Sequence, residues 1–336
     1  RSMRSNSSGP QRVKSSGATP ESMRSGQASA QAMGVRMSGW PSCAITEPSR
    51  YSTIEWITLC GWITTRICAG ARSKSQRASM TSKPLFSWIH VSDIHFGHGD
   101  AHTKIDQSLV AQALVKDLRA QFQHGVPHPD AILVTGDIGF SGGGKISSGA
   151  ANVEYATAAQ WLTDLAGAAN LGLEQVFLVP GNHDVNRNVD KDRDTDRLIK
   201  ILRANKKIAS ELDNALADPG DRSKLTSRQA NYLKFAEQCA PASRALYWHS
   251  VLPRGPLDVI LIGLNTALLA ADDQDHGHLA LGLAQIKDLT LMSPSRQRLV
   301  MVLSHHPFQE GWLADQKEAS GWLAGLGGIQ LSGHVH

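Results

Sequence analysis

The sequence lacks any apolar run near the roughly 18 residues that suggest a membrane-spanning helix, and its mean hydropathy is −0.24. It is also poor in cysteine. Cys239 is the only one of the four cysteines that lies after residue 70. No disulfide can form within the later part of the chain, so we expect a reducing, cytoplasmic setting. The apolar patch at residues 56–65 is too short to span a bilayer and lies far from residue 1, so we expect no signal peptide.

Acidic residues are scarce at the amino-terminal end. Residues 1–79 contain 11 Lys and Arg but only 3 Asp and Glu, which accounts for the overall charge of +4. Residues 80–336 carry 23 basic and 27 acidic side chains, a balance that argues modestly against binding to duplex nucleic acid. Residues 1–79 also show neither helical nor strand periodicity. We therefore predict a disordered or non-native tail over residues 1–79, followed by a domain over residues 80–336.

Short apolar runs alternate with helical patterns after residue 84. The runs are residues 85–91, 131–135, 176–179, 259–263 and 299–303, and the helical patterns cover residues 105–122 and 151–169. This alternation predicts an α/β fold with buried strands. Polar residues follow the strand ends, which is where open α/β sheets bind their ligands.

A long charged stretch over residues 185–240 predicts a helical insertion. Two interpretations of this insertion stay open. It is either a solvated surface element or a cap over the site, with Arg187 reaching a substrate phosphate.

Five short motifs follow the predicted strands. They are Asp93-Ile94-His95, Gly136-Asp137, Gly181-Asn182-His183-Asp184, His305-His306-Pro307 and Gly333-His334-Val335-His336. Carboxylate, imidazole and amide groups together are ligands for Mn, Fe, Co, Ni or Zn, and this set is too rich in imidazole for calcium. In an extended backbone, residues i and i+2 point the same way, so we expect Asp93 with His95, and His334 with His336, to face one pocket.

The motifs, in this order, resemble the signature of the calcineurin-like metallophosphoesterase superfamily, which reads D-x-H, G-D, G-N-H-D/E, H and G-H-x-H. The resemblance covers roughly residues 85–336. It implies a two-sheet β-sandwich flanked by helices, with two divalent metal ions at one end. Members of the superfamily continue beyond the last motif, so the resemblance also implies a truncated carboxyl terminus. A further domain after His336 is one interpretation.

The resemblance also implies the ligands of each ion. The first ion would be bound by Asp93, His95, Asp137 and His336, and the second by Asp137, Asn182, His305 and His334. Two ions about 3.5–4 Å apart share a carboxylate and activate a hydroxide. His183 would donate a proton or a hydrogen bond beside the leaving oxygen, positioned by Asp184. His306 would line the substrate pocket or simply pack.

Residues 139–146 fit the pattern G-x-x-x-x-G-K of a phosphate-binding loop. Ile146, however, stands where Ser or Thr is needed to bind magnesium, and the next residues do not open a helix. We expect a flexible rim of the metal pocket here, with Lys145 free to meet an anion.

Taken together, these features predict a two-metal-dependent phosphoesterase that hydrolyses a phosphomonoester or phosphodiester by means of a metal-activated hydroxide. Two alternatives stay open. One is a metal-dependent nuclease, with a local basic groove around Lys206, Lys207 and Lys224. The other is a non-catalytic metal- or partner-binding sensor module of a larger protein. We expect no membrane partner.

Overall fold

A computed structural model describes residues 51–59, 62–69, 84–143, 153–187, 193–287 and 297–335, with the backbone alone for 51–59, 62–69 and 193. All of these residues belong to the second of two compact units of the chain, residues 48–336. Among them, no helix has the length and apolar character needed to cross a membrane.

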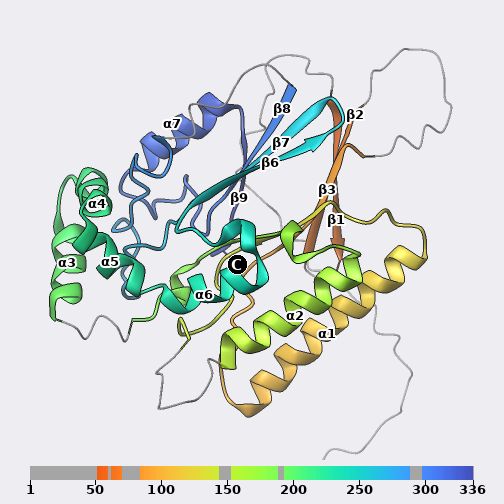
Figure 1. The fold of residues 1–336 in the computed structure, drawn as a ribbon, viewed down its shortest axis with the longest axis horizontal. Coiled ribbons are helices and arrows are strands. Elements are labelled where there is room, and N and C mark those ends of the chain that lie inside the picture. The colour runs from red at the N-terminus through yellow and green to blue at the C-terminus, as the bar shows by residue number, and fades with distance from the viewer. Residues whose placement is uncertain are drawn as a thin grey trace, which may run out of the picture. The chain divides into compact units, whose positions relative to one another are not determined.

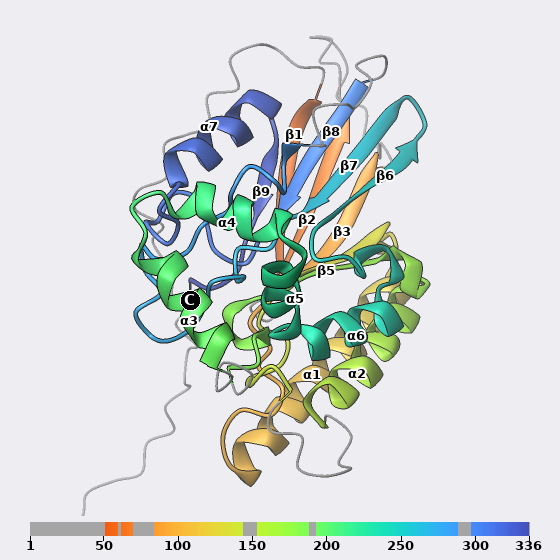
Figure 2. The same ribbon diagram turned by 60° about the vertical axis from the view of Figure 1, so that its left-hand side comes forward.

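The described strands form two sheets (Figures 1 and 2). The first has the order β1-β2-β3-β4-β5, with β1 (Tyr51–Leu59) and β2 (Trp62–Ala69) antiparallel, β2 antiparallel to β3 (Phe86–Val91), and β3 parallel to β4 (Ala131–Thr135) and β5 (Val176–Val179). The second has the order β6-β7-β8-β9. Here β6 (Trp248–Arg254) is antiparallel to β7 (Leu257–Gly263), and β7, β8 (Gln297–Leu303) and β9 (Ile329–Leu331) are parallel.

The helices occupy the segments between these strands. They are α1 (Ala101–Gln123), α2 (Val153–Ala169), α3 (Arg193–Ala204), α4 (Ile208–Ala217), α5 (Pro219–Ser227), α6 (Ala230–Cys239) and α7 (Gln316–Leu326), with short 3₁₀ turns η1 (Leu173–Gln175), η2 (Asn182–Asp184) and η4 (Pro241–Ser243). Helices α3 to α6 lie in the charged stretch 185–240, for which the sequence predicts a helical insertion.

Alternate side chains of each strand belong to different layers of the core. Phe86 and Trp88 of β3 pack with residues of β7 and β8 in the cluster between the sheets. Ile89 and Val91 of the same strand pack instead with α1, α2 and α6 on the outer face. The outer face of the second sheet packs against α3, α4, α5 and α7. Because both faces of strands β3, β4, β5 and β7 are buried, these strands read as mostly apolar runs. The predicted two-sheet α/β fold flanked by helices is confirmed.

Two parts of the fold differ from the sequence prediction or go beyond it. We expected no strand in residues 1–79, yet β1 and β2 extend the first sheet there. Their segments are rich in Thr, Ile and Trp, which favour strands, but they show no alternation of apolar and polar residues. The prediction also missed β6, β9 and α7. Strand β9 is short, and every second side chain of β6 is exposed. The domain boundary at residues 79 and 80 stays a prediction.

Candidate metal centre

The loops after β3 and β4 are joined by backbone hydrogen bonds beyond the ends of the strands. The amide of Asp93 donates to Gly136 O at 3.1 Å, and the amide of His95 donates to Asp137 O at 2.9 Å. The parallel pairing therefore continues into the loops. It holds the first two motifs in a fixed register, side by side.

The backbone turns sharply at the predicted ligands. Asp93, His95, Asp137 and His334 have φ angles of 56°, 54°, 53° and 71°, and the only other non-glycine residue with positive φ in the described part of the chain is Asn170. Left-handed backbone costs an L-residue about 1–2 kcal/mol, and such strain concentrates at functional sites. Asp93 and His95 were expected to converge through the pleat of an extended strand. That expectation is wrong, because the left-handed turns re-aim both side chains.

Two motif glycines allow the loops to approach closely. A Cβ atom at Gly136 would lie 2.7 Å from both Gly181 N and His305 Nδ1, and one at Gly181 would overlap Asp137. The positive φ of Gly136, 93°, also favours glycine. A side chain at Gly136 would push against His305, and one at Gly181 would push against Asp137.

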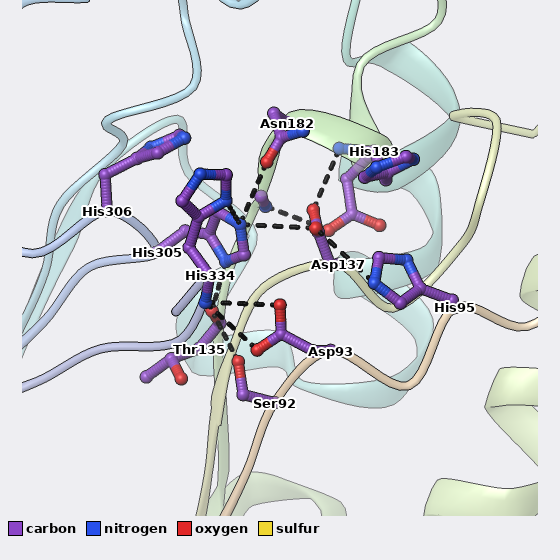
Figure 3. Close-up of polar contacts among 12 residues, drawn as sticks. Ser92, Asp93, His95, Thr135, Asp137, Asn182, His183, His305, His306 and His334 are labelled. Atoms are coloured by element: carbon purple, nitrogen blue, oxygen red, sulfur yellow. Dashed lines mark hydrogen bonds and ion pairs between the residues drawn. The ribbon is translucent and has the colours of Figure 1, made fainter. Parts of the chain in front are cut away.

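His305 lies at the centre of the site and is fully buried. Its Nδ1 is 2.8 Å from the carbonyl oxygen of Thr135, which can only accept, so Nδ1 carries a proton and donates. The opposite atom, Nε2, lies 3.3 Å from Asp137 Oδ2, 3.0 Å from Asn182 Oδ1 and 3.1 Å from His334 Nδ1 (Figure 3). Histidines that bind metals are commonly oriented in this way by a backbone carbonyl.

The electrostatics of the site favour a positive charge at this point. Burial acts to lower the pKa of His305, but the Asp137 carboxylate and its hydrogen bond outweigh burial and raise the pKa to about 9. Burial acts in the opposite sense on Asp137, and attraction to His305 holds the pKa of Asp137 well below its usual range. When His305 Nε2 carries no proton, its lone pair and those of the Asp137 carboxylate and the Asn182 amide oxygen converge on one point. This donor set suits a divalent transition metal, so the residues fit the predicted cofactor.

The ligand atoms form three overlapping groups, each with its atoms within 4.8 Å of one another. The groups are Asp93 with Asp137 and His305, His95 with Asp137 and His183, and His305 with His306 and His334. Asp137 belongs to two groups and is 2% exposed. The Asp137 carboxylate therefore lies close to predicted ligands of the first motif and to His305, and connects the two groups.

His183 is held beside these ligands by its backbone and its ring. Its amide donates to Asp137 Oδ1 at 2.8 Å, and its Nδ1 donates to Phe140 O at 2.9 Å. The ring stacks on that of Phe140, with centroids 4.9 Å apart, and meets that of His95 edge-on at 4.7 Å.

Asp184 does not make the predicted contact with the His183 ring. Its carboxylate turns the other way and accepts hydrogen bonds from the amides of Gly139 and Gly181 and from the Tyr155 hydroxyl, each at 2.9 Å. Burial, with a smaller contribution from the nearby Asp137 carboxylate, raises the pKa of Asp184 to about 6. The carbonyl of Phe140, not Asp184, accepts the hydrogen bond from the His183 ring. Asp184 instead joins the loops that carry the second and third motifs.

The remaining predicted residues lie in different surroundings. His306 is fully buried beside His334, with ring centroids 4.5 Å apart. Arg187 lines a cavity of about 440 Å³ with residues of α3 and of the loop 271–278, and none of the described metal-ligand candidates lines that cavity. Its contact with a substrate phosphate stays a prediction. His336 and Lys145 lie outside the described residues.

In the described part of the loop that resembles a phosphate-binding loop, residues 139–143, a carboxylate accepts the backbone hydrogen bonds. Glu154, in the first turn of α2, accepts hydrogen bonds from the amides of Ser141 and Gly143 and from the Ser141 hydroxyl. Amides that already donate to a carboxylate are not available to a phosphate.

Sequence reasoning missed three residues of the site. Thr135 and Phe140 act through backbone carbonyls, which every residue type has, so no side-chain signal marks them. Trp312 packs its ring edge-on to His334, with centroids 4.1 Å apart. Its only signal was an aromatic residue a few positions after the fourth motif.

Comparison with known proteins agrees with this geometry. A search of the curated proteins finds no match to the chain. The family described as Calcineurin-like phosphoesterase matches residues 87–336, a range that includes all five motifs. The resemblance inferred from the motifs is thereby confirmed, and the chain belongs to the Calcineurin-like phosphoesterase family.

Proposed function

We propose that this protein is a metal-dependent phosphoesterase that hydrolyses a phosphate monoester or diester at the site formed by the five motifs. One observation carries the proposal. The Nε2 atom of buried His305 meets the oxygens of Asp137 and Asn182 at one point, and His183 lies beside the same carboxylate.

We infer that the site holds two ions that share Asp137. Asp93, His95 and Asp137, with His336, would hold one ion, and Asp137, Asn182, His305 and His334 would hold the other. Support comes from the short distances among the described ligand atoms and from the membership of Asp137 in two of the groups. When bound, such ions offset charge on the phosphoryl oxygens and lower the pKa of a bound water.

Among the residues that are not proposed ligands, His183 is best placed to donate or accept a proton. Because its Nδ1–H donates to Phe140 O, its Nε2 is the nitrogen left to accept or give a proton. Stacking on Phe140 restrains rotation of the ring. In the protonated form, Nε2–H would donate to the leaving oxygen as the P–O bond breaks.

The direct test compares the wild type with Asp137→Asn, using bis(p-nitrophenyl) phosphate and p-nitrophenyl phosphate with added Mn²⁺. Asp164→Asn is the matched control, because Asp164 is exposed on α2 and away from the motifs. We expect metal-dependent hydrolysis that is lost in Asp137→Asn and kept in Asp164→Asn. Unchanged hydrolysis in Asp137→Asn would exclude this site.

Two further measurements separate the alternatives. Cleavage of single-stranded DNA or RNA at a comparable rate would favour a nuclease. A metal-dependent rise in melting temperature without hydrolysis of any ester would favour a binding module.

A further inference from the structure

His306 has a buried ring nitrogen without a partner. The residue is 0% exposed. Its Nε2 has no hydrogen-bond partner among the described residues, whereas its Nδ1 is 2.8 Å from Thr266 Oγ1. Buried polar atoms are nearly always satisfied in native proteins. An unsatisfied nitrogen next to proposed metal ligands therefore suggests that a group that enters the site is its partner.

Thr266 determines which nitrogen of His306 carries the proton. The Thr266 hydroxyl oxygen already accepts a hydrogen bond from the His306 amide at 3.1 Å. Thr266 is fully buried. Among the described residues, His306 Nδ1 is the one acceptor within reach of its hydroxyl hydrogen. If Nδ1 carried the proton, this hydroxyl hydrogen would be buried without an acceptor, which is unfavourable. The hydroxyl therefore donates to Nδ1, and neutral His306 bears its proton on Nε2.

The ring of His306 lies in the wall of the metal centre. Its centroid is 4.5 Å from that of His334 and 4.8 Å from that of His305. Figure 3 shows the ring beside that of His334, on the side away from Asp137. Trp312 covers the same two rings, at 5.8 Å from His306 and 4.1 Å from His334.

We propose that His306 donates a hydrogen bond from Nε2–H to a phosphoryl oxygen of the substrate, and that Thr266 is the positioning residue that fixes this tautomer. Because Nδ1 of neutral His306 accepts from Thr266, its Nε2 carries the ring's only proton and has no lone pair for a metal ion. His305 differs, because its Nδ1 stays protonated when Nε2 gives up a proton to a metal. His306 is thus assigned to the substrate, although its ring lies among imidazoles that could bind a cation. This inference rests on the proposed function and names a residue that recognises the phosphoryl group.

The first test measures the tautomer and needs no variant. In metal-free, ¹⁵N-labelled wild-type protein, long-range ¹H–¹⁵N correlations distinguish a ring protonated on Nε2 from one protonated on Nδ1. We expect the Nε2–H pattern for His306. The Nδ1–H pattern would overturn the inference, because Nε2 would then be a metal-ligand atom.

The second test measures binding of inorganic phosphate to the Mn²⁺-loaded protein by calorimetry, together with its metal content. We expect His306→Phe to weaken phosphate binding roughly tenfold or more, the effect of losing a hydrogen bond to a charged group, with unchanged metal content. His306→Gln, which keeps an N–H donor, should lose less. Thr266→Val should shift the tautomer and weaken phosphate binding, whereas Thr266→Ser should behave as the wild type.

The outcomes separate this inference from the proposed function. Loss of metal from both His306 variants would make His306 a ligand and overturn the inference. So would wild-type phosphate affinity in His306→Phe. Absence of both phosphate binding and hydrolysis in the metal-loaded wild type would instead refute the proposed function, and with it the substrate role of His306.

Discussion

Metal binding is expected to displace a proton from His305. In the metal-free protein the pKa of His305 is about 9, because attraction to the buried Asp137 carboxylate outweighs the opposing effect of burial. At pH 7 the imidazole is therefore protonated, with the proton on Nε2 pointing at Asp137 and Asn182. A metal ion must take the place of that proton, because only a neutral imidazole is a ligand.

The size of the effect follows from the pKa. One proton competes with one ion, so the apparent Kd should fall about tenfold for each pH unit up to about pH 9 and then level off. The same shift affects the metal-free fold. Since the folded pKa lies above the unfolded value of 6.5, the proton stabilises the fold fully below pH 6.5. That contribution, on the order of 3 kcal/mol, is lost as the pH rises through 9.

Calorimetric titration of the metal-free protein with Mn²⁺ measures this exchange. Repeating the titration at pH 7 in buffers of different ionisation enthalpy gives the number of protons released. We expect about one proton from His305, and none from that position in His305→Asn. His124→Asn is the matched control, because His124 is exposed at the end of α1. Equal proton release and an equal pH dependence in the wild type and His305→Asn would refute the assigned charge state.

Three further predictions concern the residues around this centre. Gly181→Ala places a Cβ atom against Asp137, so metal affinity measured by titration should fall at least tenfold, and wild-type affinity would contradict the close approach. His183→Ala should slow turnover of esters with poor leaving groups far more than that of p-nitrophenyl esters; equal losses would exclude a donor role. Asp184→Asn leaves one acceptor oxygen for several donors, including the Tyr155 hydroxyl. It should lower the free energy of unfolding by about 2–4 kcal/mol in urea denaturation, and an unchanged midpoint would show that this carboxylate is not needed to join the loops.

Most of the core strands were predictable from local pattern. The runs 131–135 and 176–179 coincide with β4 and β5, because strands buried on both faces stay apolar along their whole length. Strand β6 was not predictable in the same way, because its side chains after Trp248 alternate between exposed and half-buried. Strands β1 and β2 lie in a segment whose composition predicts a tail, and the pairing of β2 with β3 is a long-range contact that local sequence does not reveal.

The five motifs, by their order and residue types, were enough to place the chain in its family and to name the candidate ligands. The direction in which each side chain points was decided by the fold. Asp93 and His95 converge through left-handed turns instead of strand pleat, and Asp184 faces amides instead of the His183 ring. Residue types carry the chemistry of a ligand. Backbone torsions decide which ligand atoms point toward one another. Partners that lie far away in sequence decide it too. The carbonyl of Thr135, for example, reaches His305 only once the two sheets have packed.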